Sequence, residues 1–197
     1  MTARLVPAQG GVTLGILAGG EASRLGGLDK AWLVRDGIAQ VVRLVDVLAP
    51  QVEAVVVSAN RNAERFLAHG LRALHDRSRG LGPLGGLDVL ADACRTPWLL
   101  TLPVDVVEVP PDLVERLLLS PGSQGVSAHD DEGPQPLVAL WPVAGLRDAL
   151  PAAIASGNLA VRSLQARLGM GVLRMEGIRL GNLNTRADLA AAGIASP

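Results

Sequence analysis

The chain has 197 residues, 49% of them apolar and 19% charged, and a formal net charge of −1. This length suits one domain with a substantial core, and the balance of apolar and charged residues excludes a disordered chain. The charge close to zero, with three Trp, one Phe and no Tyr, argues against binding to nucleic acid or to acidic membranes.

Residues 1–11 are expected to be a flexible leader, followed by a single domain over residues 12–197. The leader has one arginine and no long apolar region, so it does not resemble a signal peptide. No apolar run approaches the roughly 20 residues of a membrane span. Cys94 is the only cysteine, which excludes an internal disulfide and is typical of a reducing compartment. We therefore predict a cytoplasmic protein without membrane contact.

The stretch GILAGGEASRLGGLDK, residues 15–30, carries the strongest functional signal. An apolar strand over residues 13–17 ends at paired glycines, which let the backbone approach a ligand because they lack a Cβ atom. Arg24 and Lys30 lie within the glycine-rich frame and indicate an anionic ligand, most simply a phosphate chain. A glycine-rich surface loop without a ligand is the alternative.

Apolar runs and helical periodicity alternate along the rest of the chain. Helices are predicted over residues 38–48, 62–68, 84–93, 112–119, 144–154, 159–168 and 185–193, and strands over 52–57, 71–74, 98–102, 126–128, 137–141 and 171–175. Asn158 is the expected N-cap of the helix over 159–168, and Thr185 with Asp188 forms the capping box of the last helix. This alternation predicts an α/β fold with a mostly parallel central sheet and helices on both faces.

Polar residues follow several predicted strands, and ligands in such sheets bind at the carboxyl ends of the strands. Asp105 ends an apolar strand and suits Mg²⁺, which binds one or two carboxylates together with phosphate oxygens; a helix cap is the alternative. Asp76 is a contact for a base or ribose, or a plain turn residue. Together with the loop cations, these residues favour phosphoryl or nucleotidyl transfer, in which positioning and charge neutralisation dominate.

A literal G-x-G-x-x-G pattern at Gly80, Gly82 and Gly85 is the main competing signal, since it would indicate an NAD-dependent oxidoreductase. The strand before it is very short, and Pro83 removes an N–H group where a pyrophosphate would need one. The chain has no Walker A motif and no G-x-S-x-G motif. Nucleotidyl transfer remains the favoured chemistry.

The run LAGGEASRLGGLDK resembles the signature L-A-G-G-x-x-x-R-M-G-G-x-D-K of the molybdenum cofactor guanylyltransferases, which are nucleotide-diphospho-sugar-transferase-like nucleotidyltransferases. The similarity continues in VVVSANRNAE, GPLGG, VDVVEVPPDL and NLNTRADL, nearly to the end of the chain. The resemblance implies a three-layer, Rossmann-like nucleotidyltransferase domain. It also implies Mg²⁺-dependent transfer of GMP from GTP to molybdopterin with release of pyrophosphate, and transient contact with proteins that deliver or receive the cofactor.

The same resemblance implies a set of site residues. The residues expected to bind the nucleotide or lie beside it are Leu17, Ala18, Gly19, Gly20, Lys30, Ser58, Asp76, Asp105, Asn182 and Asn184. Arg24, Lys30 and Asp105 are the expected catalytic residues, and Asp105 is also the expected metal ligand. The two asparagines match a pair expected to contact a metal-bound water or the substrate.

The chain departs from the family pattern at several positions. Ser58 stands where the family often has Asn, Val107 replaces a Pro near Asp105, and Leu159 lies where arginines are common. Two alternatives therefore stay open: a related nucleotidyltransferase that uses CTP or another acceptor, and a degenerate nucleotide-binding module without catalysis.

Overall fold

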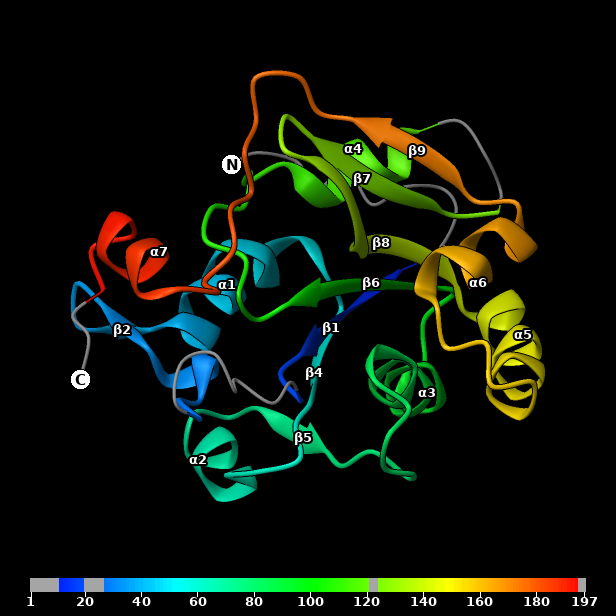
Figure 1. The fold of residues 1–197 in the computed structure, drawn as a ribbon, viewed down its shortest axis with the longest axis horizontal. Helices are drawn as coiled ribbons and strands as arrows, with labels where there is room; N and C mark the ends of the chain where they lie inside the picture. The colour runs from blue at the N-terminus through cyan, green and yellow to red at the C-terminus, as the bar shows by residue number, and fades with distance from the viewer. Residues whose placement is uncertain (1–10, 20–26, 121–123, 195–197) are drawn as a thin grey trace.

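A computed structural model describes residues 11–19, 27–120 and 124–194 (Figure 1). The elements in chain order are β1 (Val12–Leu17), η2 (Lys30–Trp32), β2 (Val34–Arg35), β3 (Ile38–Ala39), α1 (Gln40–Leu48), η3 (Ala49–Gln51), β4 (Ala54–Ser58), α2 (Ala63–Ala68), β5 (Arg72–Leu74), α3 (Pro83–Ala93), β6 (Trp98–Pro103), α4 (Leu113–Leu119), β7 (Val126–Asp130), β8 (Gly133–Pro142), α5 (Val143–Ala155), α6 (Val161–Leu168), β9 (Gly171–Arg174) and α7 (Arg186–Ala191). Apart from Gly11, the expected leader lies outside the described residues. Within the described ranges, no helix combines the length and the apolar character that a membrane crossing needs.

Seven strands form one sheet in the order β5-β4-β1-β6-β8-β7-β9. β1 pairs in parallel with β4 and β6, β4 pairs in parallel with β5, and β7 pairs in parallel with β9. Only β8 runs against its neighbours β6 and β7. The predicted mostly parallel α/β sheet is therefore confirmed, and the strands β5, β4, β1 and β6 all end at the same edge.

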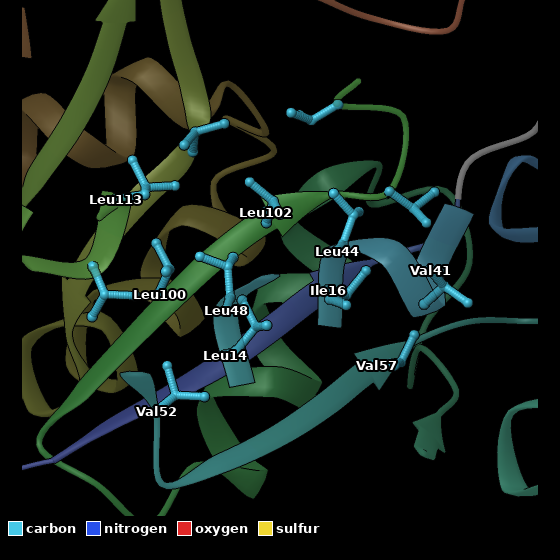
Figure 2. Packing of buried hydrophobic residues seen from close by; sticks show 14 of the residues in the cluster. Leu14, Ile16, Val41, Leu44, Leu48, Val52, Val57, Leu100, Leu102 and Leu113 are labelled. Carbon is cyan, nitrogen blue, oxygen red and sulfur yellow. The ribbon is translucent and has the colours of Figure 1, made fainter. Parts of the chain in front are cut away.

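Side chains alternate across the sheet, so neighbouring positions on one strand pack into different cores. On one face, Ile16 and Leu102 pack with Leu44 of α1 (Figure 2). On the other face, Leu99 and Trp141 belong to a second core with residues of α3, α5 and α6. Helices α1 and α4 cover one face and α3, α5 and α6 cover the other, which gives the three layers that the sequence predicts.

Two predicted helix starts are wrong. Ile38 does not begin a helix: β2 and β3 form a short antiparallel hairpin, because Asp36 and Gly37 both adopt positive φ, 54° and 80°, and make a tight two-residue turn. Asn158 does not cap α6, which begins at Val161 after Ala160 without a side-chain cap. The Asn158 N–H group instead donates to Ser156 Oγ just beyond the end of α5.

The capping box predicted at the last helix is confirmed. The Thr185 hydroxyl accepts the N–H of Asp188, and the Asp188 carboxylate accepts the N–H of Thr185. Leu189 of α7 and Leu183 before it pack in a small core with Leu33. The C-terminal helix therefore lies beside the β2–β3 hairpin, near the start of the chain (Figure 1).

Candidate functional site

Three of the predicted site residues meet at one point. Lys30 Nζ lies 2.8 Å from Asp105 Oδ2 and 2.8 Å from Asn184 Oδ1. Lys30 opens η2, Asp105 lies just beyond β6, and Asn184 lies just before α7. The side chains of Lys30 and Asp105 are 17% and 23% exposed, so the ion pair is partly shielded from water but still reachable by a ligand.

The segment that carries Asn184 is fixed to the end of β6 by backbone contacts. Val106 and Asn182 form an antiparallel bridge, and Leu183 N donates to the Asp105 carbonyl at 2.9 Å. The Asp188 carboxylate accepts the N–H groups of Asn184 and Thr185. These two hydrogen bonds, and more weakly the charge of Lys30, lower the pKa of Asp188. Asn184 is therefore held through its backbone as well as its side chain.

Asp76 forms a second polar cluster at the same edge of the sheet. Its carboxylate accepts Ser58 Oγ at 3.1 Å and Asn60 Nδ2 at 2.9 Å, and its N–H donates to Asn60 Oδ1 at 2.9 Å. The Ser58 side chain is buried, so its hydroxyl orients the carboxylate from the protein side. These contacts fix Asp76 as a hydrogen-bond acceptor at the carboxyl-terminal edge of the parallel strands.

Glycines bring the backbone close to this second cluster. A Cβ atom at Gly19 would lie 3.3 Å from Asn60 Nδ2, and one at Gly85 would lie 3.1 Å from Asp76 Oδ2. Along the exit of β1, Leu17 and Ala18 are partly buried and Gly19 is exposed. The exit of β1 and the first turn of α3 therefore both approach Asp76.

The remaining predicted residues differ in what the structure says of them. Gly20 and Arg24 lie outside the described residues. Asn182 lines an open groove of about 810 Å³, together with Asn184, Arg35 and Arg179. This groove lies between the β2–β3 hairpin, the segment after β6 and α7, and is continuous with the Lys30 cluster through Asn184.

Sequence reasoning missed two features of the site. Lys30 is the only lysine among the 18 basic residues of the chain, which a simple count would have shown. Sequence reasoning also gave Asn62 no role, although Ser58, Asn60 and Asn62 place a polar side chain at every second position from the last residue of β4 onward. The Asn62 amide donates to the carboxylate of Asp29, the residue before Lys30.

The residues at the first cluster suit a metal that arrives with its substrate. Within the described residues, no group of three or more His, Cys, Asp or Glu side chains could hold a metal ion. Asp105 offers one carboxylate, with the amide oxygen of Asn184 nearby. A single carboxylate fits Mg²⁺, which usually keeps several waters and binds through one or two carboxylates and substrate phosphates.

A family model and the sequences of known relatives agree on one family. Residues 14–171 match the model of the MobA-like NTP transferase domain. A protein of Acidiphilium cryptum named molybdenum cofactor guanylyltransferase is 40% identical over 187 residues, 90% of this chain and 91% of that protein. A protein of the same name from Shewanella putrefaciens is 36% identical over 147 residues, 73% and 75% of the two chains.

A solved structure shares the fold. The crystal structure of molybdopterin-guanine dinucleotide biosynthesis protein A from Archaeoglobus fulgidus superposes with a TM-score of 0.70 at 21% identity. The match covers 92% of this chain and 96% of that one.

Proposed function

The chain belongs to the MobA-like NTP transferase family, and from this premise we propose that it is a cytoplasmic molybdenum cofactor guanylyltransferase. In the proposed reaction, a phosphate oxygen of molybdopterin attacks the α-phosphorus of GTP. The bond between that phosphorus and the oxygen bridging to the β-phosphate breaks, and pyrophosphate leaves. The observation that carries the proposal is the meeting of Lys30, Asp105 and Asn184 at the sheet edge where Asp76 also lies.

Asp76 is the proposed contact for the nucleoside. Its carboxylate, oriented by Ser58 and Asn60, would accept hydrogen bonds from N–H groups of guanine or from ribose hydroxyls. Gly19, just after β1, has no side chain and leaves room for the nucleotide beside Asp76. This arrangement fixes the nucleoside end of GTP relative to the first cluster.

Lys30 is the proposed charge partner of the leaving pyrophosphate. Negative charge grows on the leaving group as the bond breaks, and a fixed cation in a shielded site stabilises it. We assign the same role to Arg24, which precedes Lys30 in the glycine-rich stretch of the sequence. Asp105 would hold Mg²⁺, with the Asn184 amide close by, and the metal would add positive charge at the phosphates.

The test is a panel of the four nucleoside triphosphates with Mg²⁺ and molybdopterin, scored by pyrophosphate release and by the mass of the product. We expect turnover with GTP. Asp105→Asn should lower that turnover at least about a hundredfold while the protein stays folded, because loss of a charge-stabilising group typically costs this much. Asp46→Asn, an exposed carboxylate on α1, is the matched control and should keep full activity.

Three results would contradict parts of the proposal. Turnover with CTP but not GTP would replace guanylyl transfer with cytidylyl transfer. GTP binding without turnover of any triphosphate would indicate a non-catalytic nucleotide-binding module. Full activity of Asp105→Asn would remove the metal role of that carboxylate.

A further inference from the structure

The segment after β4 connects the two polar clusters. Ser58 and Asn60 hold Asp76, whereas Asn62 Nδ2 donates to Asp29 Oδ2 at 2.7 Å. Five consecutive residues therefore contact both the carboxylate proposed for the nucleoside and the residue that precedes Lys30. The proposed function gives Asn62 and Asp29 no role.

Asp29 controls the turn that carries Lys30. Its second oxygen, Oδ1, accepts the N–H of Ala31 at 3.1 Å and caps η2, and its carbonyl accepts the N–H of Trp32 at 3.0 Å. Lys30 is the first residue of η2, so the orientation of this turn sets where its side chain starts. Asp29 therefore acts on the ammonium group through the backbone.

Asn62 holds Asp29 from an unusual conformation. Its φ of 57° and ψ of 34° lie in the left-handed region, which Asn and Asp adopt more readily than most side chains. The residue is exposed, so packing does not explain an amide at this position. Among the described residues, Asp29 is the one group that its side chain contacts by a hydrogen bond.

We propose that Asn62 is a positioning residue for nucleotidyl transfer, acting through Asp29 to place the Lys30 ammonium group between Asp105 and Asn184. The kinetic part of this inference rests on the proposed function. The competing explanation is that the bond only tethers α2 and stabilises the fold.

A reciprocal exchange separates these two explanations. Asn62→Asp alone sets two carboxylates against each other. Asp29→Asn alone is a milder change, because two facing amides can still form a hydrogen bond. The double variant Asp29→Asn/Asn62→Asp restores a donor facing an acceptor, and the new amide oxygen at position 29 still accepts the N–H of Ala31. Asn62→Gly keeps the left-handed backbone and deletes the side chain. Glu64→Ala, an exposed position in the first turn of α2, is the control.

The first readout is steady-state kinetics of GTP-dependent pyrophosphate release. Small displacements of a positioned group can cost about a hundredfold in rate, so we expect Asn62→Gly and Asn62→Asp to lower kcat about ten- to hundredfold. Asp29→Asn, which keeps a hydrogen bond to Asn62, should lower kcat less. KM for GTP should change less than about threefold, and the double variant should recover to within about threefold of the parent kcat. Glu64→Ala should match the parent.

The second readout does not need activity. Because Lys30 is the only lysine, protein labelled with lysine carrying ¹⁵N at Nζ gives one ammonium signal. We expect this signal to shift in Asn62→Gly and Asn62→Asp, to return in the double variant, and to stay in place in Glu64→Ala. If the parent protein is active, an unchanged kcat in Asn62→Gly would overturn the inference. An unchanged lysine signal in Asn62→Gly would also overturn it. A parent that turns over no triphosphate would overturn the proposed function instead, and the Lys30 signal would then decide the positioning role.

Discussion

Lys30 is chemically distinct from every other cation of the chain, since the remaining basic residues are arginines. Its compact ammonium group carries three donors, of which Asp105 and Asn184 take two at 2.8 Å. Among residues 11–19, 27–120 and 124–194, no group accepts the third donor, which can bind a phosphate oxygen. A guanidinium group is planar and longer, so from the same backbone position it does not place a compact positive charge where the Lys30 ammonium lies.

Lys30→Arg is therefore predicted to lose most of its catalytic activity, although it keeps the positive charge. We expect kcat for GTP-dependent pyrophosphate release to fall about a hundredfold, close to the effect of Lys30→Ala, because the cation no longer lies where the leaving-group charge develops. Arg72→Lys makes the reverse exchange at an exposed position on β5, outside the candidate site. It should leave the rate unchanged. Activity close to the parent in Lys30→Arg would show that charge alone is sufficient.

At the level of elements, the first turn of α3 touches both the end of β1 and the Asp76 cluster. A Cβ atom at Gly86 would lie 2.6 Å from Leu17 Cδ2 and 2.9 Å from Ser58 Oγ. Gly145, also inside a helix, has no comparable neighbour: its nearest atom, Leu168 Cδ2, would be 3.5 Å away. The two glycines offer the same substitution in opposite environments.

Gly86→Ala is predicted to destabilise the protein by up to about 2 kcal/mol, because the overpacking by the added methyl group costs about 1–3 kcal/mol and the loss of a helical glycine offsets about 0.5–1 kcal/mol of it. It should also raise KM for GTP, since Ser58 orients Asp76. Gly145→Ala should stabilise by about 0.5–1 kcal/mol, the usual gain from removing a helical glycine. Urea unfolding of both variants measures the difference, and equal shifts of the same sign would contradict the packing at Gly86.

The sequence predicts elements well where one strong signal acts alone. The apolar runs of β1 and β6 and the capping box of α7 are examples, and all three are confirmed. Local signals fail where a neighbour competes: Ile38 fits a helical face, but the turn at Asp36 and Gly37 places it in a hairpin. Asn158 is a good N-cap by residue type, but α6 begins at Val161 with Ala160 at the N-cap position, so the Asn158 side chain caps no N–H group of the first turn.

Site residues follow the same rule. Asp76 and Asp105 are candidate site residues because they follow strands, and Lys30 because it ends a glycine-rich stretch of the sequence. Their partners could not be predicted in the same way. Asn184 meets Lys30 across 154 positions, and this contact depends on how the chain returns after β9. Asn62 reaches Asp29 from a left-handed conformation that no residue pattern specifies.

Across the molecule as a whole, the site depends on the segment between β9 and α7, which crosses from one edge of the sheet back to the end of β6. β9 lies at the far edge of the sheet from β5, yet the segment after it reaches back to the end of β6. The β7–β8 turn guides this return with two neighbouring aspartates. Buried Asp130 accepts the N–H of Leu180 at 2.9 Å, and exposed Asp131 accepts the N–H of Gly177 at 3.1 Å.

Asp130→Ala is predicted to cost about 3 kcal/mol of folding free energy, because the buried N–H of Leu180 and the turn N–H groups of Glu132 and Gly133 lose their acceptor. Since Leu180 lies two residues before Asn182, kcat should also fall more than GTP affinity does.

Asp131→Ala removes a single hydrogen bond at an exposed position, and water can replace the lost acceptor. Its losses in stability and in kcat should both be smaller. Urea unfolding, GTP titration and turnover of the two variants give the comparison, and equal losses at both positions would contradict a role for the buried carboxylate in bringing the asparagines to the site.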